Sequence, residues 1–292
     1  MRYFVVSDIH SFYKPLKKAL KEKHFFKKDT GHTLIVCGDI FDRGPDTIKV
    51  YKFLKTIPKK RCILIKGNHE ELYFRLLQKD YPEDYDFSNG TVRTFCHIAA
   101  YELSSAEIDP DFTERELWYL AGSVMFSEKF PEEAARAKAT WKNIVDAVKH
   151  SEITKWLKSK QWVNYYELYN YIFVHSFIPL LWNQERELSE DYCIYYGYTQ
   201  YFDYKFNWRD SSNKEWAKAA WGCAYKFFDA GLFDEEKKNG KVLVCGHYRC
   251  SEFNKHYYNI ESHDIYYGKN LIAIDATTAL TDTVNVLVID YL

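Results

Sequence analysis

The chain has 292 residues, of which 47% are hydrophobic, so it is long enough to bury a sizeable core. The chain has 40 Lys and Arg residues and 41 Asp and Glu residues, and its formal net charge is −1. This balance, without a polybasic stretch or an acidic tail, gives no support for nucleic-acid or membrane-surface binding. No apolar run reaches the roughly 18 residues that a membrane-spanning helix needs.

The seven cysteines indicate a reducing compartment. Their number is odd, they form no C-x-x-C pair, and several lie inside apolar runs. The N-terminal stretch MRYFVVSDIHS also lacks the apolar segment of a secretory signal. We therefore expect buried, reduced thiols in a cytoplasmic protein.

The first eighty residues alternate between short apolar runs and amphipathic stretches. Strands are predicted at 2–7, 33–37 and 61–66, and helices at 15–25, 46–57 and 70–79. This order predicts βαβ units and a mainly parallel sheet with both faces covered. In such sheets ligands bind at the carboxyl ends of the strands.

The pattern changes after this region. Residues from about 81 to 164 read as a mainly helical insertion, with helices predicted at 114–122, 131–150 and 151–159. A strand is predicted at 169–176, and an irregular, aromatic-rich insertion follows from about 178 to 238, with a helix at 214–228. Strands at 241–247, 271–276 and 283–290 end the chain, the last two joined by a hairpin connection at 277–282. We expect one domain over 1–292.

Residue types that bind metals follow five of the predicted strands. In SDIHS, Asp8 and His10 are two residues apart, and at a strand end both side chains point the same way. The other clusters are GDIFDRG, GNHEE, FVHS and GHY. Together the strand ends supply Asp8, His10, Asp39, Asn68, His175 and His247. This set is too large for one tetrahedral zinc and suits two metal ions that share a carboxylate.

Each of these residues, taken singly, also has a purely structural explanation. The alternatives are helix capping by Asp8 and Asp39, a surface ion pair between Arg43 and Asp42, a turn at Asn68 and a core histidine at His175. Their common position at strand ends favours a functional site over this set of coincidences.

In chain order, the motifs D-x-H, G-D-x-x-D-R-G, G-N-H-E, H and G-H resemble those of the calcineurin-like metallophosphoesterases. The D-R-G and G-N-H-E forms are similar to the phosphoprotein phosphatase family, including its bacterial and phage serine/threonine phosphatases, whose relatives include diadenosine tetraphosphate hydrolases. The resemblance covers roughly 1–80, 169–176 and 240–290. It implies an α/β fold, the four-layer α-β-β-α sandwich of the metallophosphoesterases, in a single catalytic domain with a helical insertion.

The resemblance also implies a role for each motif residue. Asp8 and His10 would hold a first metal, Asp39 would bridge to a second, and Asn68, His175 and His247 would complete the second site. His69 would be the general acid, oriented by Asp42, and Arg43 would grip the phosphate oxygens. Two divalent cations about 3.5–4 Å apart would acidify a bridging water for in-line attack on phosphorus. We expect manganese, and iron or zinc also suits these ligands.

The family commonly supplies a second phosphate-binding arginine between the last two histidines. Arg209 is the first candidate and Arg186 the second, while Arg249 lies only two residues beyond His247.

Three further segments depart from the family pattern. Ser7 and Ser11 flank the first motif where glycines are usual, Ser176 and Phe177 replace small residues, and IDATTA lacks the glycine of the family's IDTGA. None of these changes removes a predicted ligand, so they bear on substrate choice more than on activity.

We therefore predict a metal-dependent phosphomonoesterase that acts on a phosphorylated protein or a small phosphoester. The first hypothesis is a serine/threonine, or dual-specificity, protein phosphatase. A hydrolase of diadenosine tetraphosphate or another small phosphoester is the alternative, followed by a catalytically silent binding module on the same fold. The set Asp42, Arg43 and His69 argues against the silent module, because binding alone needs no acid. The oligomeric state stays open.

Overall fold

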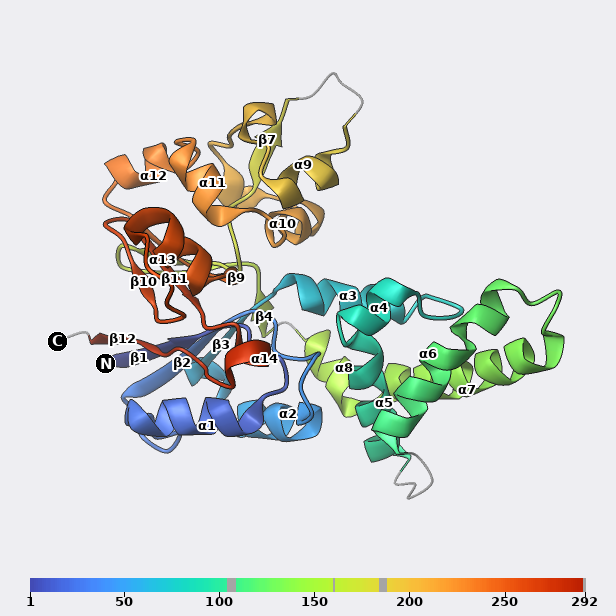
Figure 1. The fold of residues 1–292 in the computed structure, drawn as a ribbon. Coiled ribbons are helices and arrows are strands. Elements are labelled where there is room, and N and C mark those ends of the chain that lie inside the picture. The colour runs from blue at the N-terminus through green and yellow to red at the C-terminus, as the bar shows by residue number, and fades with distance from the viewer. Residues whose placement is uncertain (104–108, 160, 184–187, 291–292) are drawn as a thin grey trace.

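A computed structural model describes residues 1–103, 109–159, 161–183 and 188–290. Within these residues two five-stranded sheets lie face to face, and helices cover their outer faces (Figure 1). The strand orders are β12-β1-β2-β3-β4 and β10-β11-β9-β6-β5, and β7 and β8 form a separate two-stranded sheet. The predicted α/β sandwich is thereby confirmed.

The first sheet contains the predicted βαβ units. Its parallel strands are β1 (Arg2–Val6), β2 (His32–Cys37), β3 (Cys62–Ile65) and β4 (Trp162–Val163). The strand β12 (Leu287–Asp290) pairs antiparallel with β1. The connecting segments carry α1 (Tyr13–Glu22), α2 (Thr47–Lys55), the 3-10 turn η1 (Lys59–Arg61) and α3 (Asn68–Leu76).

The three central strands of the second sheet are parallel. In it β9 (Val242–Arg249) lies between β6 (Tyr171–Phe173) and β11 (Leu271–Asp275). The antiparallel edge strands are β5 (Tyr166–Leu168) and β10 (Tyr266–Tyr267). The outer face is covered by α11 (Ala224–Asp229), α12 (Asp234–Lys238) and α13 (Cys250–Tyr258) (Figure 1).

Alternation along the strands builds the layers. Because successive side chains of a strand point to opposite faces, each central strand buries one set of residues between the sheets and the other set under helices. The inner set includes Val5, Ile35, Ile65, Phe173, Val244 and Ile274. The outer sets include Phe4, Val6 and Leu34 on the first sheet and Ile172, Leu243 and Ala273 on the second. These three apolar layers fix the position of one sheet relative to the other. The carboxyl ends of the central strands of both sheets then lie at the same end of the sandwich.

A group of helices stands to one side of the sandwich (Figure 1). It consists of α4 (Asp84–Ser88), α5 (Thr91–Glu102), α6 (Pro110–Met125), α7 (Pro131–His150) and α8 (Glu152–Leu157). The sequence patterns indicated α6, α7 and α8 but not α5. This helix begins TVRTF, with β-branched and aromatic residues that favour helix weakly, and it forms because Val92, Phe95 and Ile98 are buried.

Between β6 and β9 the chain forms short elements. They are β7 (Leu180–Trp182), α9 (Glu190–Tyr196), η2 (Thr199–Tyr201), β8 (Phe202–Tyr204), η3 (Trp208–Asp210) and α10 (Asn213–Ala219). The single helix predicted at 214–228 is in fact α10 and α11, separated at residues 220–223. None of the helices in the described ranges combines the length and apolarity needed to cross a bilayer.

The predicted hairpin at 277–282 is wrong. Residues Thr278–Thr281 form the short helix α14, and the strands on either side belong to different sheets. The chain therefore crosses from the second sheet to the edge of the first, where β12 pairs with β1. Apolar strands that pair with each other and apolar strands that join two sheets have the same local pattern, so the sequence did not distinguish them.

Candidate functional site

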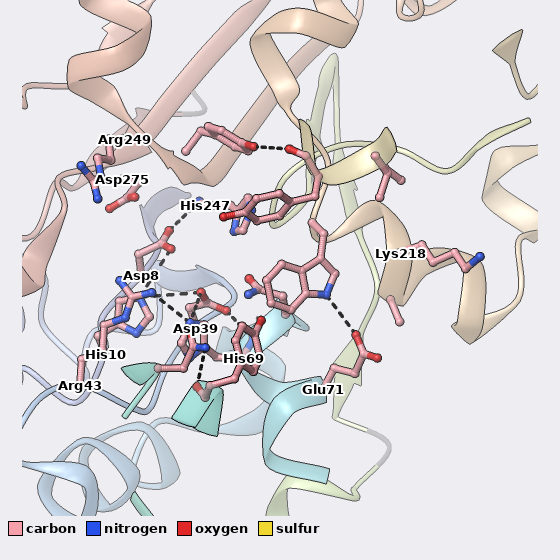
Figure 2. A pocket seen from close by; sticks show the side chains of 18 of the residues that line it. Asp8, His10, Asp39, Arg43, His69, Glu71, Lys218, His247, Arg249 and Asp275 are labelled. Atoms are coloured by element: carbon pink, nitrogen blue, oxygen red, sulfur yellow. Dashed lines mark hydrogen bonds and ion pairs between the residues drawn. The ribbon is translucent and has the colours of Figure 1, made fainter. Parts of the chain in front are cut away.

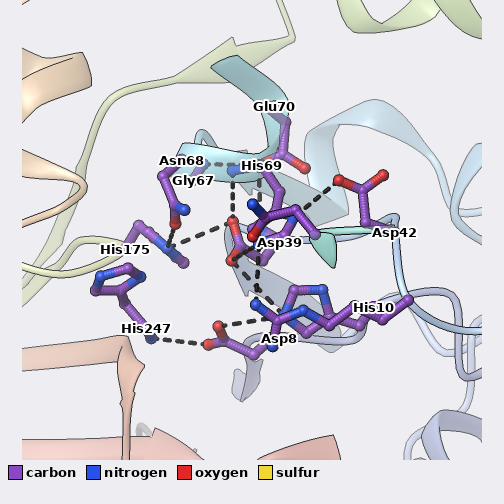
Figure 3. A network of polar contacts seen from close by, with 12 residues as sticks. Asp8, His10, Asp39, Asp42, Gly67, Asn68, His69, Glu70, His175 and His247 are labelled. Carbon is purple, nitrogen blue, oxygen red and sulfur yellow. Dashed lines mark hydrogen bonds and ion pairs between the residues drawn. The ribbon is translucent and has the colours of Figure 1, made fainter. Parts of the chain in front are cut away.

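The loops that follow β1, β2 and β6, the first turn of α3 and the carboxyl-terminal part of β9 meet at one end of the sandwich (Figure 3). They bring together all six predicted ligands. Among the described residues, two groups have metal-binding atoms that all lie within 4.8 Å of one another: His10, Asp39 and His69, and Asp39, His175 and His247. The two groups share Asp39, so the arrangement has one carboxylate at its centre.

The two oxygens of Asp39 face opposite sides of the site. Oδ2 lies 3.8 Å from Nε2 of His10 and 3.8 Å from Nε2 of His69. Oδ1 lies 3.4 Å from Nε2 of His175. Burial, with the nearby carboxylate of Asp8, raises the pKa of Asp39 well above its ordinary value. Two buried carboxylates this close are stable in their ionised form only beside positive charge, which fits a cation site.

His10 and His175 direct the lone pair of Nε2 toward the centre of the site. Nδ1 of His10 lies 3.0 Å from the carbonyl oxygen of Phe41, and Nδ1 of His175 lies 2.8 Å from that of Cys37. Since a carbonyl only accepts, each Nδ1 carries the proton and each Nε2 faces inward as a lone pair. Burial lowers the pKa of His10, which keeps this ring neutral and able to bind metal.

Asn68 completes the second group. Its Oδ1 lies 2.7 Å from Nε2 of His175. Two atoms that both offer electron pairs repel at this distance unless a proton or a cation neutralises them. The amide, imidazole and carboxylate donors here therefore fit a divalent metal ion.

Asp8 connects the two halves of the site. Its Oδ2 accepts the backbone N–H of His247 at 2.9 Å, and its Oδ1 lies 3.9 Å from Nε2 of His10. The ring of His247 stands 5.0 Å from that of His175. Asp8 thus lies between His10 and the backbone of His247 and contacts both halves of the site.

The backbone of these loops is unusual. Left-handed φ angles occur at Asp8, His10, Asp39, Asp42, Arg43 and His247. Such strain is typical of functional sites, where the surrounding structure enforces it. The expectation that Asp8 and His10 share a face by strand alternation is wrong, because β1 ends at Val6 and the loop itself orients them. The residues that precede α1 and α2 as N-caps are Phe12 and Asp46, so helix capping does not explain Asp8 or Asp39.

His69 and Asp42 form a buried pair. Nδ1 of His69 lies 2.7 Å from Oδ2 of Asp42, and Nε2 lies 3.3 Å from Nη2 of Arg43. Arg43 therefore contacts the imidazole, and the surface ion pair between Arg43 and Asp42 considered above is not formed, because Asp42 pairs with His69. Burial raises the pKa of Asp42 to about 7, opposed by hydrogen bonds from Thr94 and Thr91. Burial and the Arg43 charge lower the pKa of His69.

Glu70 is a site residue to which sequence reasoning assigned no role. Its buried carboxylate accepts the backbone N–H of Asp39 at 3.0 Å, of Ile40 at 3.0 Å and of Gly67 at 2.7 Å. A Cβ at Gly67 would lie 2.2 Å from Oδ1 of Asp39, so this close approach requires glycine. The signal was present as a glutamate at the third position of a helix, where it reaches back to the cap.

Asp275 is a second such residue. It is buried, lines the cavity, and accepts the N–H of Thr277 at 2.6 Å. Burial, with the charge of Asp8, raises its pKa. Its only sequence signal was its place in the IDATTA segment at the end of a predicted strand.

A cavity of about 830 Å³ opens above these groups. Arg43 and Arg249 lie on one side of it, and Glu71 and Lys218 lie on the opposite side (Figure 2). Aromatic side chains form much of the wall, namely Tyr85, Tyr192, Tyr195, Tyr196, Trp221 and Tyr248. Trp221 donates from Nε1 to Oε2 of Glu71 at 3.3 Å, which connects the wall to α3. The cavity has room for a phosphate and a sizeable organic group.

The candidates for a second arginine differ in position. Arg249 lines the cavity. Arg209 does not: its Nε contacts Glu167 at 2.5 Å, its Nη1 and Nη2 contact Glu236 at 2.9 and 3.1 Å, and its guanidinium stacks over Trp208. The structure therefore does not bring Arg209 to the cavity. Arg186 lies outside the described residues.

Comparison with known families gives one match. The profile of the calcineurin-like phosphoesterases matches residues 1–162, more than half of the chain. These residues include the loops after β1, β2 and β3, and the helices up to α8.

Curated relatives match over a shorter stretch. A symmetrical bis(5'-nucleosyl)-tetraphosphatase of Buchnera aphidicola subsp. Schizaphis graminum is 40% identical over 70 residues, which cover 24% of each chain. An asymmetrical bis(5'-nucleosyl)-tetraphosphatase of Bacillus subtilis is 29% identical over 85 residues, which cover 27% of this chain and 35% of that protein. The matched segments thus span about a quarter to a third of these relatives' lengths.

A solved structure matches over almost the whole chain. The cold-active protein-tyrosine phosphatase of a psychrophilic Shewanella species superposes with a TM-score of 0.52 at 16% identity, and the match covers 99% of this chain and 75% of that one. At this identity the similarity establishes the fold.

Proposed function

The chain belongs to the calcineurin-like phosphoesterase family, and from this premise we propose that it is a dinuclear phosphomonoesterase that releases phosphate from phosphoserine and phosphothreonine in proteins. Hydrolysis of phosphoric esters is the chemistry of the family, and the matched relatives are tetraphosphatases. The observation that carries the proposal is the position of the Asp42–His69 pair and Arg43 beside two donor groups that share Asp39.

The family is metal-dependent, and the donor set fits two divalent ions. Asp8, His10 and Asp39 would hold one, and Asp39, Asn68, His175 and His247 would hold the other. Bound cations supply Lewis-acid activation of the phosphate and of water. Carboxylate, imidazole and amide ligands favour manganese, with iron or zinc as the other candidates.

The chain's own groups would bind and protonate the substrate. The Arg43 guanidinium lies at the cavity and its fork matches two phosphate oxygens, so it would orient the phosphoryl group and balance its charge. Nε2 of His69 faces the same space and accepts from Arg43 here; with the ring in its imidazolium form, balanced by Asp42 at Nδ1, Nε2 would carry the proton that the departing oxygen receives. Asp42 accepts the Nδ1 proton, which fixes the ring orientation and raises its basicity. Arg249 would serve as the second phosphate ligand.

A positioned acid favours esters with poor leaving groups. The alkoxide of serine or threonine departs only when it is protonated, whereas a phosphate chain departs readily as an anion. The buried His69–Asp42 pair therefore supports the protein phosphatase over the polyphosphate hydrolase.

Hydrolysis of a dinucleoside polyphosphate is the second candidate. The aromatic wall, which includes Tyr195, Trp221 and Tyr248, offers surfaces on which a nucleobase would stack. The curated relatives named above are tetraphosphatases of this kind. A silent binding module is a weaker candidate because it has no use for the intact acid pair.

We also propose that the chain is one catalytic domain over 1–292, with inserted segments at about 81–164 and 178–238. Support comes from both segments reaching the cavity, Tyr85 from the first and Trp221 from the second. The seven cysteines are free and buried in the described chain, which supports a reducing, cytoplasmic location.

Phosphate release by the metal-free protein, reloaded with Mn²⁺, Fe²⁺ or Zn²⁺, tests the proposal. We expect turnover of p-nitrophenyl phosphate with Mn²⁺, and its loss in Asp39→Asn and His69→Asn. A phosphoserine peptide and diadenosine tetraphosphate are then compared at equal concentration, and the peptide should give the larger kcat/KM. Preference for the dinucleotide would establish the second candidate, and metal binding without turnover of any substrate would establish the silent module.

A further inference from the structure

We propose that Thr91 and Thr94 of helix α5 are positioning residues for catalysis, which hold Asp42 in the orientation that aligns His69 as the acid. This inference rests on the proposed function. It assigns an active-site role to a helix for which the sequence showed no chemistry. The two hydroxyls contact Asp42 rather than the substrate, so they act through His69.

The threonine hydroxyls occupy the positions on Asp42 that His69 leaves open. Thr94 donates from Oγ1 to Oδ1 of Asp42 at 2.7 Å, and Thr91 donates from Oγ1 to Oδ2 at 2.8 Å. His69 Nδ1 shares Oδ2 at 2.7 Å. Both carboxylate oxygens therefore have donors, and the plane of the carboxylate is set from two directions.

Thr94 also fixes the backbone of the catalytic loop. Its Oγ1 accepts the N–H of Asp42 at 3.0 Å, so one hydroxyl contacts both ends of the same residue. Asp42 itself has a left-handed φ of 74° and has no regular secondary structure to hold it. All three residues are buried, and water is therefore a poor substitute for a lost hydroxyl.

These donors constrain the proton on His69. Both threonines donate to Asp42, which favours its carboxylate form, and Nδ1 of His69 is then the donor in the contact with Oδ2. The second nitrogen, Nε2, is then the atom that faces Arg43 and the cavity. Loss of a threonine hydroxyl would let Asp42 rotate and would free the ring of His69 to tilt.

The start of α5 is built to approach the loop closely. Gly90, with φ +80°, precedes the helix, and a Cβ there would lie 2.4 Å from the backbone nitrogen of Arg43. Arg93 donates from Nη1 to the carbonyl oxygen of Arg43 at 3.3 Å. Thr91 and Thr94 are three residues apart and so share one face of the helix.

Helix α5 is held by packing against the neighbouring helices. Phe95 stacks on Trp141 of α7 with ring centroids 5.6 Å apart and planes 13° apart. The side chains of Phe95 and Trp141 are both buried in the hydrophobic core. The threonines are thus presented by a rigid helix, and the precision of the Asp42–His69 pair depends on it.

Thr94→Val and Thr91→Val remove each hydroxyl with little change of shape. Their kinetics are measured on p-nitrophenyl phosphate, which has a good leaving group, and on phenyl phosphate, which has a poorer one. Because a misaligned acid matters most for the poor leaving group, we expect kcat for phenyl phosphate to fall roughly 10–100-fold in Thr94→Val, with a several-fold smaller loss on p-nitrophenyl phosphate. KM should stay unchanged, and Thr94→Ser should restore most of the rate.

Two controls separate alignment from folding. Thr154→Val removes a buried hydroxyl of the same helical group, which contacts Tyr73 and the carbonyl of Val148 and not Asp42, and it should affect both substrates equally. In the His69→Asn background, Thr94→Val should cause no further loss, because the acid that it aligns is gone. If Thr94→Val does not fold, Thr91→Val gives the same test with a smaller expected loss.

A spectroscopic readout tests the inference without turnover. In protein labelled with ¹⁵N-histidine, the Nδ1-bound proton of His69, assigned by its absence in His69→Asn, should shift or broaden in Thr94→Val and not in Thr154→Val. If the wild type hydrolyses neither ester, the proposed function fails, and this signal alone decides the positioning role. Equal losses on both esters together with an unchanged His69 signal would overturn the inference.

Discussion

Oδ1 of Asp39 lies 3.4 Å from Nε2 of His175, across the boundary between the two sheets. Asp39 follows β2 of the first sheet and His175 follows β6 of the second, so the contact exists only when the sheets are packed together. The other oxygen of Asp39 faces His10 and His69. One side chain therefore belongs to both donor groups, and the site depends on the packing of the whole sandwich.

Replacing Asp39 should remove both metal ions. Asp39→Ala deletes the carboxylate that the two groups share, whereas His175→Asn affects only one group. After equilibrium dialysis against Mn²⁺, we expect about two ions bound per wild-type chain, about one in His175→Asn and fewer than one in Asp39→Ala. The control is Asp46→Asn, a nearby aspartate that pairs with Lys49. Retention of two ions by Asp39→Ala would contradict the shared-ligand assignment.

Arg43→Lys should weaken phosphate binding although it keeps the charge. A guanidinium fork contacts two oxygens at once, and an ammonium does not. We expect the inhibition constant of inorganic phosphate to rise about tenfold and kcat to fall about 10²-fold. Arg115→Lys, on the exposed side of α6, serves as the control and should change neither value. An unchanged inhibition constant in Arg43→Lys would place the phosphate elsewhere in the cavity.

Glu70→Gln should destabilise the fold. The carboxylate accepts backbone N–H groups of Asp39, Ile40 and Gly67, and a glutamine would turn an NH₂ group toward some of them. Unfolding in urea should show a loss of about 3 kcal/mol in the free energy of unfolding. The matched control is Glu71→Gln, whose carboxylate sits at the cavity and accepts from Trp221, and it should lose less than about 1 kcal/mol. Equal losses would mean that Glu70 is not the support of the loop.

Arg249→Ala should affect substrate binding, and Arg209→Ala should affect the stability of the fold. Arg249 lines the cavity, so its loss should raise KM for a phosphopeptide several-fold and leave the melting temperature unchanged. Arg209 is bound to Glu167 and Glu236, so its loss should cost about 2 kcal/mol of stability and leave KM unchanged. Thermal melts and steady-state kinetics of the two variants distinguish these outcomes. A raised KM in Arg209→Ala alone would reverse the assignment.

Much of the site was predictable because its residues follow strand ends. Asp8, Asp39, Asn68, His175 and His247 each come directly after a buried apolar run, and in a sandwich of parallel strands such positions meet at one end. Short motifs with several polar residues in fixed order also restrict the chemistry, as GDIFDRG and GNHE do here. Local patterns in the sequence therefore suffice to assign each of these residues to the end of an apolar strand.

Other features had no local signal. The two threonines of α5 look like ordinary helix residues, and only their distance to Asp42 shows what they contact. Arg209 was the first candidate in the sequence, yet Glu167 and Glu236 hold it away from the cavity, which Arg249 lines. The strands on either side of α14 read as a hairpin although they belong to different sheets.

The sequence by itself determined the βαβ order of the first eighty residues, the family, and the ligand-type residues, because apolar periodicity and short motifs depend on neighbours along the chain. The tertiary structure alone decided that α5 supports Asp42 and which arginine reaches the cavity. These are contacts between residues far apart in the chain, and their geometry follows from how the two sheets and the adjacent helices pack, which no local pattern encodes.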